Sequence, residues 1–128
     1  MIPYSKQDIT EDDIQAVVKT LKSDFLTQGD ATPFFEKSLC QYTGSQFSVA
    51  VNSGTSALHV ACLSLDLGKG DWLWTTAVSF VASANCGLYC GAKVDFVDID
   101  PNDWNLSIHN LKRKLKIAKQ GAKLPKVL

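Results

Sequence analysis

The sequence has no excess of either charge. Its 128 residues include 13 basic and 13 acidic side chains, which gives a formal net charge of zero. Nucleic-acid-binding domains usually carry a basic excess, so this balance argues against nucleic acid as a partner. The length allows one domain, and a hydrophobic content of 45% is ordinary for a globular chain and too high for a disordered one.

Signals of several other protein classes are also missing. The first residues contain no basic segment followed by an apolar one, so they do not form a signal peptide. Residues 72–92 carry no charge, but their serines, threonines and glycines are too polar for a membrane-spanning helix. The four cysteines form no Cys-x-x-Cys pair and only two histidines accompany them. We therefore expect a cytoplasmic protein with reduced, buried thiols, no metal site and no membrane contact.

The charges that are present are unevenly distributed. Seven of the 13 basic groups lie in residues 107–128, which contain no acid, so residues 1–106 have a net charge of −7. Between Gly44 and Ala92 the only charged residues are Asp66, Lys69 and Asp71. Because a small free-standing domain is mostly surface, this charge-poor middle predicts a core that is covered by protein outside the printed sequence.

Hydrophobic periodicity predicts an alternation of helices and strands. The first predicted helix begins within residues 8–13 and ends near residue 23. Four further helices are predicted at about 32–42, 54–65, 79–89 and 107–119. Strands are predicted over 47–52, 72–76 and 93–97, with another beginning near 125–128. Gly44 is predicted to end the second helix, and Ile108, Leu111 and Leu115 to face inward from the last one. This order indicates an α/β protein with a largely parallel sheet, buried on both faces.

The strongest local signal is the run Ser53-Gly54-Thr55-Ser56, between a predicted strand and a predicted helix. The first amides of a helix are unpaired and carry partial positive charge, so they can bind an anion such as phosphate. Gly54 permits close approach of the backbone, and the hydroxyls of Thr55 and Ser56 can add hydrogen bonds. The alternative is a helix capped by Ser53 with no ligand. The glycine patterns of Walker-type and Rossmann nucleotide sites are absent.

Phe80 follows the next predicted strand. Ligands of open α/β sheets bind at the edge where parallel strands end, so Phe80 is expected near the start of the helix at Gly54. It could stack on a flat ring whose phosphate lies at Gly54–Ser56. The alternative is an aromatic side chain of the core.

A series of motifs occurs along the chain in the order found in one family. These motifs are Phe25-Leu26-Thr27-Gln28-Gly29, Phe35-Glu36, residues 51–58, Gly70-Asp71, residues 79–85, Gly91-Ala92 and residues 96–100. Together they resemble the DegT/DnrJ/EryC1/StrS family of sugar aminotransferases that use pyridoxal 5'-phosphate (PLP). The start of the chain and residues 94–101 look most similar to the branch that makes pseudaminic acid precursors.

The resemblance implies a partial large domain of the fold type I PLP-dependent transferases, the aspartate aminotransferase fold. Residues 1–30 would form an amino-terminal helix and substrate-site loop, and residues 31–128 the first part of the PLP-binding domain. Gly54, Thr55 and Ser56 would hold the PLP phosphate, and Phe80 would stack on its ring. The sugar-nucleotide site, shared across a homodimer, would be lined by Tyr4, Leu26, Thr27, Gln28 and Gly29. The implied reaction transfers an amino group from glutamate to C4 of a UDP-linked 4-keto-6-deoxy-N-acetylhexosamine.

The resemblance also implies that no catalytic residue lies in this chain. In the family, the Schiff-base lysine and the aspartate on the pyridinium nitrogen follow the matched region, and a transaminase needs both. We expect Lys112, Lys114, Lys116 and Lys119 to form a solvated helix face, Asp98 and Asp100 to serve turns, and this chain alone to be inactive. Three alternatives stay open: a deoxysugar 3-dehydratase with histidine replacing the lysine, a non-catalytic binding module, and a free-standing flavodoxin-like phosphate binder.

Overall fold

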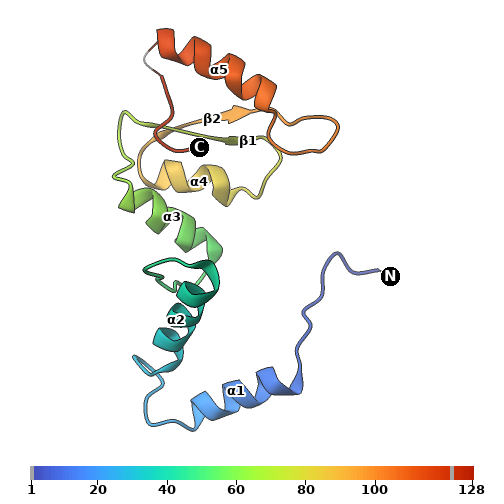
Figure 1. Cartoon of the computed structure of the whole chain (residues 1–128), viewed down its shortest axis with the longest axis vertical. Helices are drawn as coiled ribbons and strands as arrows, with labels where there is room; N and C mark the ends of the chain where they lie inside the picture. Colours follow the sequence, from blue (N-terminus) through green and yellow to red (C-terminus); the bar gives the residue numbers. More distant parts are fainter. Residues whose placement is uncertain (1, 122) are drawn as a thin grey trace. The chain divides into compact units, whose positions relative to one another are not determined.

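A computed structural model describes residues 2–121 and 123–128. The chain forms two compact units, residues 1–50 and residues 51–128, and each is described in turn. The first contains α1 (Glu11–Leu21) and α2 (Ala31–Thr43). The second contains, in order, α3 (Gly54–Ser64), β1 (Trp72–Thr76), α4 (Ala82–Tyr89), β2 (Lys93–Val97) and α5 (Ile108–Gln120) (Figure 1).

The start of α1 is fixed by a reciprocal pair of hydrogen bonds. The Thr10 side chain accepts from the Asp13 amide at 3.4 Å, and the Asp13 carboxylate accepts from the Thr10 amide at 2.8 Å. Two helix-end amides are satisfied in this capping box, and acidic side chains in the first turn favour the positive end of the helix dipole. The hydrogen bond from the Thr10 amide, followed by one that the Thr10 hydroxyl donates to Asp13 Oδ2 at 2.8 Å, lowers the pKa of Asp13. The predicted start within residues 8–13 is confirmed.

The end of α2 is also where it was predicted. Gly44 adopts a left-handed conformation with φ of 74°, and its amide donates to the Cys40 carbonyl at 2.9 Å. The strand predicted over 47–52 is wrong: none of the described strands pairs with this segment. The amide of Ala50 instead donates to the Glu36 side chain of α2 at 2.7 Å. A strand needs a partner for its backbone groups, and here a side chain satisfies one of them.

The second unit is built on a parallel sheet. β1 and β2 pair in register from Trp72 opposite Lys93 to Thr76 opposite Val97, so the predicted bounds of both strands are confirmed. On the other edge of β1, Val127 forms a parallel bridge with Leu73, and its carbonyl accepts from the Trp74 amide at 2.9 Å. Near the last residues, where a strand was expected to begin, the structure has this single bridge, so β1 lies between β2 and Val127.

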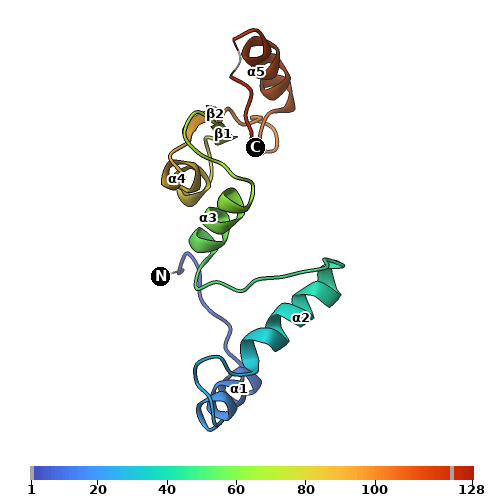
Figure 2. The ribbon, with the colours of Figure 1, turned by 90° about the vertical axis from the view of Figure 1, so that its left-hand side faces the viewer.

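Helices cover both faces of these strands, which lie between α4 and α5 in two perpendicular views (Figures 1 and 2). Successive β1 residues point to opposite faces. On the face that α3 and α4 cover, Leu73 belongs to a buried hydrophobic cluster. This cluster consists of Cys62, Leu67, Leu73, Cys86 and Ala92. Trp74 joins the α5 side, with Val97 and Ala118. The predicted α/β class is confirmed, with parallel strands and flanking helices.

Gly87 is the point at which α4 approaches the sheet most closely. A Cβ atom there would lie 3.0 Å from Leu73 Cβ and 3.1 Å from Val94 Cγ2. Only glycine leaves room for a helix backbone at this distance. The predicted start of α4 at Ser79 is wrong, because the helix begins at Ala82 and its N-cap, Val81, has no side chain that could accept from the first amides.

The basic helix α5 begins after Ser107, whose side chain accepts from the Asn110 amide at 3.3 Å. Leu111 and Leu115 pack against the Trp74 cluster as predicted. The inward position predicted for Ile108 is wrong, since its side chain is 60% exposed. The solvated position predicted for Lys114 is also wrong. This side chain is only 25% exposed and lies over the sheet, where its amine pairs with Asp95 at 2.6 Å. Lys112, Lys116 and Lys119 are exposed.

Lys126 ties the last residues to the turn before β1. Its amine donates to the Asp66 carbonyl at 2.6 Å and lies 3.1 Å from Asp71 Oδ2. Asp71 also accepts from the Gly68 amide at 3.0 Å. The hydrogen bond from Gly68, followed by the one from Lys126, holds the pKa of Asp71 below its usual range. No helix of the described residues is both long and apolar enough to cross a membrane.

Candidate cofactor and substrate site

The first turn of α3 is held by a network of short polar side chains. Ser53 is the N-cap, with an extended backbone, and its hydroxyl accepts from the Ser56 amide at 3.1 Å. The Ser56 hydroxyl donates to Asn52 Oδ1 at 2.7 Å and lies 3.0 Å from the Ser53 hydroxyl. This network fixes both the entry of the chain into the helix and the position of the Ser56 oxygen.

The amides of Gly54 and Thr55 are left free by this network. Neither has a hydrogen-bond partner among the described residues. A Cβ atom built on Gly54 would meet nothing within 4 Å, so packing does not require glycine there. Two donors at the positive end of the helix dipole are therefore unpaired within the described residues, which is the arrangement that binds a phosphate group. The Ser53 cap and an anion site are compatible, because the cap engages Ser56 and leaves the preceding amides free.

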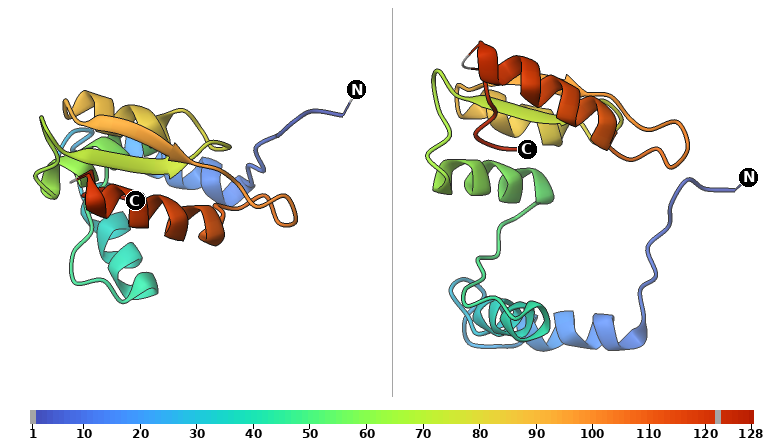
Figure 3. Two further views of the ribbon diagram at one scale, coloured as in Figure 1. Left: turned by 90° about the horizontal axis from the view of Figure 1, so that it is seen from above. Right: turned by 45° about the horizontal axis from the view of Figure 1, so that its top comes forward.

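Phe80 lies just before α4 and is 74% exposed, so within the described residues it is not part of the core. Helices α3 and α4 pack together, with the rings of His59 and Tyr89 5.4 Å apart. Both helices begin at the edge of the sheet where β1 ends (Figure 3). Phe80 and the Gly54–Ser56 turn therefore share one edge of the second unit.

The first unit contains a cavity of about 560 Å³ between α1, the loop that follows it and the start of α2. Leu26 and Gly29 line this cavity, whereas Thr27 and Gln28 lie in the same loop but are not among the lining residues. The loop is tight: a Cβ atom on Gly29 would lie 2.5 Å from the Phe25 carbonyl oxygen, so only glycine fits. Tyr4 is fully exposed in the segment before α1.

Two residues, one in each unit, were given no individual role in the sequence reasoning. Asn52 orients the Ser56 hydroxyl, and Glu36 holds the amide of Ala50 on the approach to α3. Both belong to motifs that mark the family resemblance, but their partners depend on how the chain folds. The predicted turn role of Asp100 is confirmed, since its carboxylate accepts from the Asn102 amide at 2.9 Å. The turn role of Asp98 stays a prediction; its carboxylate accepts from the adjacent Ile99 amide at 2.8 Å.

The thiols and acids of the described residues show no metal-binding arrangement. No group of three or more His, Cys, Asp and Glu side chains there is placed to hold a metal ion. All four cysteines are free, and two of them, Cys62 and Cys86, are buried. Burial, followed by the neighbouring thiols of Cys86 and Cys90, raises the pKa of Cys62 to about 12. A thiol that stays protonated at neutral pH is a packing group and not a nucleophile.

Comparison with known proteins places this geometry in a family. Residues 7–121 match the DegT/DnrJ/EryC1/StrS aminotransferase family. The chain belongs to this family, and the resemblance inferred from its motifs is confirmed.

Individual relatives agree with this assignment. The chain is 44% identical over 115 residues to the UDP-4-amino-4,6-dideoxy-N-acetyl-beta-L-altrosamine transaminase of Campylobacter jejuni, a match that covers 90% of this chain and 30% of that protein. It superposes on Spr1654 from Streptococcus pneumoniae, solved in its PLP form, with a TM-score of 0.81 and 35% identity, over 88% and 29% of the two chains.

The aminotransferase PseC of Helicobacter pylori, which takes part in pseudaminic acid biosynthesis, gives a TM-score of 0.79 and 34% identity over 87% of this chain and 30% of that one. The chain thus spans about 30% of the length of the Campylobacter transaminases that it matches. These superpositions confirm the predicted fold: a part of the large α/β domain of fold type I PLP-dependent transferases.

Proposed function

We propose that the protein carrying this chain is a PLP-dependent aminotransferase acting on a nucleotide sugar. Its amino donor would be glutamate, and its acceptor C4 of a UDP-linked 4-keto-6-deoxy-N-acetylhexosamine on a route to pseudaminic acid. Family membership supports the reaction class, and the Campylobacter and Helicobacter relatives support the sugar. The observation that carries the proposal is the pair of amides at Gly54 and Thr55, which have no hydrogen-bond partner within the described residues at the start of α3.

The residues of the α3 turn fit the phosphate of this cofactor. The Gly54 and Thr55 amides would donate to its oxygens, and the Ser56 hydroxyl, which donates to Asn52 Oδ1 in this structure, would turn its proton to the phosphate. The exposed ring of Phe80, at the same edge, would cover one face of the pyridine ring. When bound, PLP supplies an electron sink for amino-group transfer.

The substrate would be bound by the first unit. Leu26 and Gly29 line its cavity, and we assign the adjoining Thr27 and Gln28, together with Tyr4, to the sugar nucleotide as well. The tight turn at Gly29 would fix the shape of this loop. A homodimer that shares this site, and a cytoplasmic location, stay predictions.

This chain alone would not transaminate, because none of its 12 lysines lies in a motif that matches the family's Schiff-base lysine. Lys114 and Lys126 are engaged in ion pairs with Asp95 and Asp71 in the structure. A chemically competent protein would need the lysine from sequence beyond the matched region.

Cofactor binding tests the α3 turn directly. Gly54→Val fills the open space with a side chain, and we expect it to weaken PLP binding to the full protein by roughly 10- to 100-fold, the effect of losing a hydrogen bond to a charged group. Pyridoxal without its phosphate should bind the variant and the parent equally. Gly68→Ala is the matched control, since a Cβ there meets only the Cys90 carbonyl oxygen at an ordinary 3.9 Å. Equal loss of PLP and pyridoxal affinity would show that this turn does not hold the phosphate.

The reaction is tested by incubating the full protein with PLP, glutamate and the UDP-linked 4-keto sugar. We expect 2-oxoglutarate and a sugar in which an amine replaces the C4 carbonyl, as read by mass spectrometry. A product that has lost its C3 hydroxyl and kept the ketone would identify the dehydratase alternative instead. If neither product forms although PLP binds, the binding-module alternative would be favoured.

A further inference from the structure

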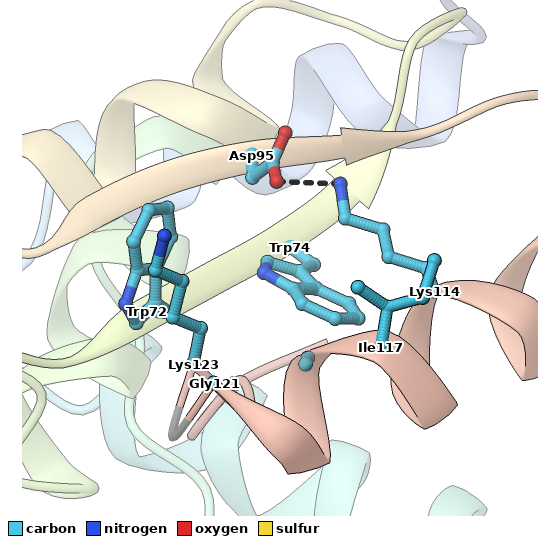
Figure 4. Close-up of a pocket in the computed structure, with 8 residues that line it drawn as sticks. Trp72, Trp74, Asp95, Lys114, Ile117, Gly121 and Lys123 are labelled. Carbon is cyan, nitrogen blue, oxygen red and sulfur yellow. Dashed lines mark ion pairs between the residues drawn. The ribbon is translucent and has the colours of Figure 1, made fainter.

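A second cavity lies on the face of the sheet that α5 covers, away from α3 and α4. It has a volume of about 210 Å³ (Figure 4). Its apolar walls are Trp72 and Trp74 of β1 together with Ile117 and Ala118 of α5, and its charged lining residues are Asp95, Lys114 and Lys123. None of the residues assigned above to PLP or to the sugar nucleotide lines it.

The indole of Trp74 offers an unused hydrogen-bond donor in this cavity. Trp74 is 2% exposed, and its buried Nε1 has no hydrogen-bond partner among the described residues. In Figure 4 the nitrogen edge of the ring is directed toward the space between Trp72 and Lys123. Buried donors in native proteins are nearly always paired, so this N–H calls for an acceptor that the described residues do not supply.

The charges of the cavity favour an anionic acceptor. Lys114 pairs with Asp95 at 2.6 Å, so these two charges compensate each other. Lys123 adds a second cation and forms no ion pair within the described part of the chain. Burial alone would raise the pKa of Asp95, but the hydrogen bonds from Lys114 and Phe96, aided by the charges of Lys114 and Lys123, hold it below its usual range. The lining therefore carries a net positive charge at neutral pH.

The aromatic walls exclude a cation and suit a flat apolar group. An ammonium group already lies over each indole, Lys114 over Trp74 at 4.7 Å and Lys93 over Trp72 at 5.4 Å, so a cationic ligand would be repelled. A dry cavity of about 150 Å³ is large enough to bind benzene. The volume of about 210 Å³ therefore accommodates one aromatic ring with a small substituent.

We propose that this cavity binds a small aromatic monocarboxylate. The ring lies against the walls formed by Trp72, Trp74 and Ile117. The carboxylate accepts a hydrogen bond from Trp74 Nε1 and pairs with the Lys123 ammonium group. The proposal does not depend on the proposed function, because its residues lie on the other face of the sheet from α3 and α4.

Benzoate is the probe that tests this site. Titrated into the full chain labelled with ¹⁵N, it should shift the Trp74 indole N–H resonance downfield in a saturable manner. Benzyl alcohol has the ring without the charge and acetate has the charge without the ring, so each should bind at least about tenfold more weakly. A Trp74 resonance that benzoate does not move, or moves no more than acetate does, would overturn the proposal.

Two pairs of variants separate a site from general affinity for aromatic anions. Lys123→Gln should weaken benzoate about tenfold, and Lys119→Gln, which removes the same charge from an exposed position outside the cavity, should leave it unchanged. Trp74→Phe keeps an apolar ring but removes the donor and should weaken benzoate by a similar factor, whereas Trp104→Phe alters an exposed indole and should have no effect. The lysine pair is decisive even if Trp74→Phe does not fold. Equal affinities of the Lys123 and Lys119 variants would refute the site.

Discussion

Replacing Gly87 with alanine tests how tightly α4 is seated on the sheet. The added methyl group would lie 3.0 Å from Leu73 Cβ, 3.1 Å from Val94 Cγ2 and 3.2 Å from Leu73 Cδ1. The Cδ1 and Cγ2 contacts involve side-chain ends that could rotate. The Cβ contact involves an atom fixed to the backbone of β1, and β1 is held by β2 on one edge and by Val127 on the other.

Two effects of opposite sign set the magnitude of this change. Alanine is a better helix former than glycine by about 1 kcal/mol, which favours the variant. Overpacking a well-packed core costs about 1–3 kcal/mol, and the upper half of that range applies where the opposing atom cannot move. We therefore expect Gly87→Ala to lower the free energy of unfolding by about 1–2 kcal/mol.

Urea denaturation of the full chain, followed by circular dichroism, measures this difference. Gly68→Ala serves as the control, because the same methyl group there makes only an ordinary 3.9 Å contact. A Gly87→Ala variant that is more stable than the parent by about 1 kcal/mol would show that helix propensity dominates. The close seating of α4 would then be refuted.

Three further predictions concern other positions. Asp95→Asn should remove stability at neutral pH: the folded-state pKa of Asp95 lies below its ordinary value of 3.8, so its contribution is present above that pH and is lost as the pH falls through the folded-state pKa. The parent and the variant should therefore converge in acid, and a difference between their urea midpoints that is constant from pH 7 to pH 2 would contradict this. Ser107→Ala should lower the free energy of unfolding by about 1 kcal/mol, because the cap of α5 is lost. Ser107→Asp should keep most of that stability, as urea midpoints would show. Gly29→Ala forces a methyl group to within 2.5 Å of the Phe25 carbonyl oxygen, so chymotrypsin should cleave after Phe25 faster than in the parent; an unchanged rate would contradict the tight turn.

The parts of the fold that could be predicted are those with local signals. β1 and β2 are short apolar segments flanked by turn residues, and both of their predicted bounds agree with the structure. Gly44 has the left-handed conformation that ends a helix, and its position after an apolar helix face identified it. The segment 47–52 has the composition of a strand, but whether it forms one depends on a partner elsewhere in the chain. Composition alone does not supply that partner.

The two candidate binding sites also differ in whether their signals are local in the sequence. The Gly54–Ser56 turn was predictable because helix-end amides and small residues adjoin in sequence. The Trp74 cavity was not, because its walls come from a strand and from a helix about 40 residues further along. Lys114 shows why: helical periodicity places its Cα near the edge of the buried face, but its long side chain folds over Trp74 to reach Asp95.

The bridge between Leu73 and Val127 also has a consequence for the order of events during synthesis. β1 and β2 are separated by one short helix and can pair as soon as both have been made. The second edge of β1 stays open until about 30 residues beyond β2 have been translated, when Lys126 and Val127 become available. A contact so distant in sequence forms late, because the intervening chain must first be ordered. A nascent chain halted before Lys126 would therefore expose an unpaired edge of the central strand, a surface that a chaperone could recognise.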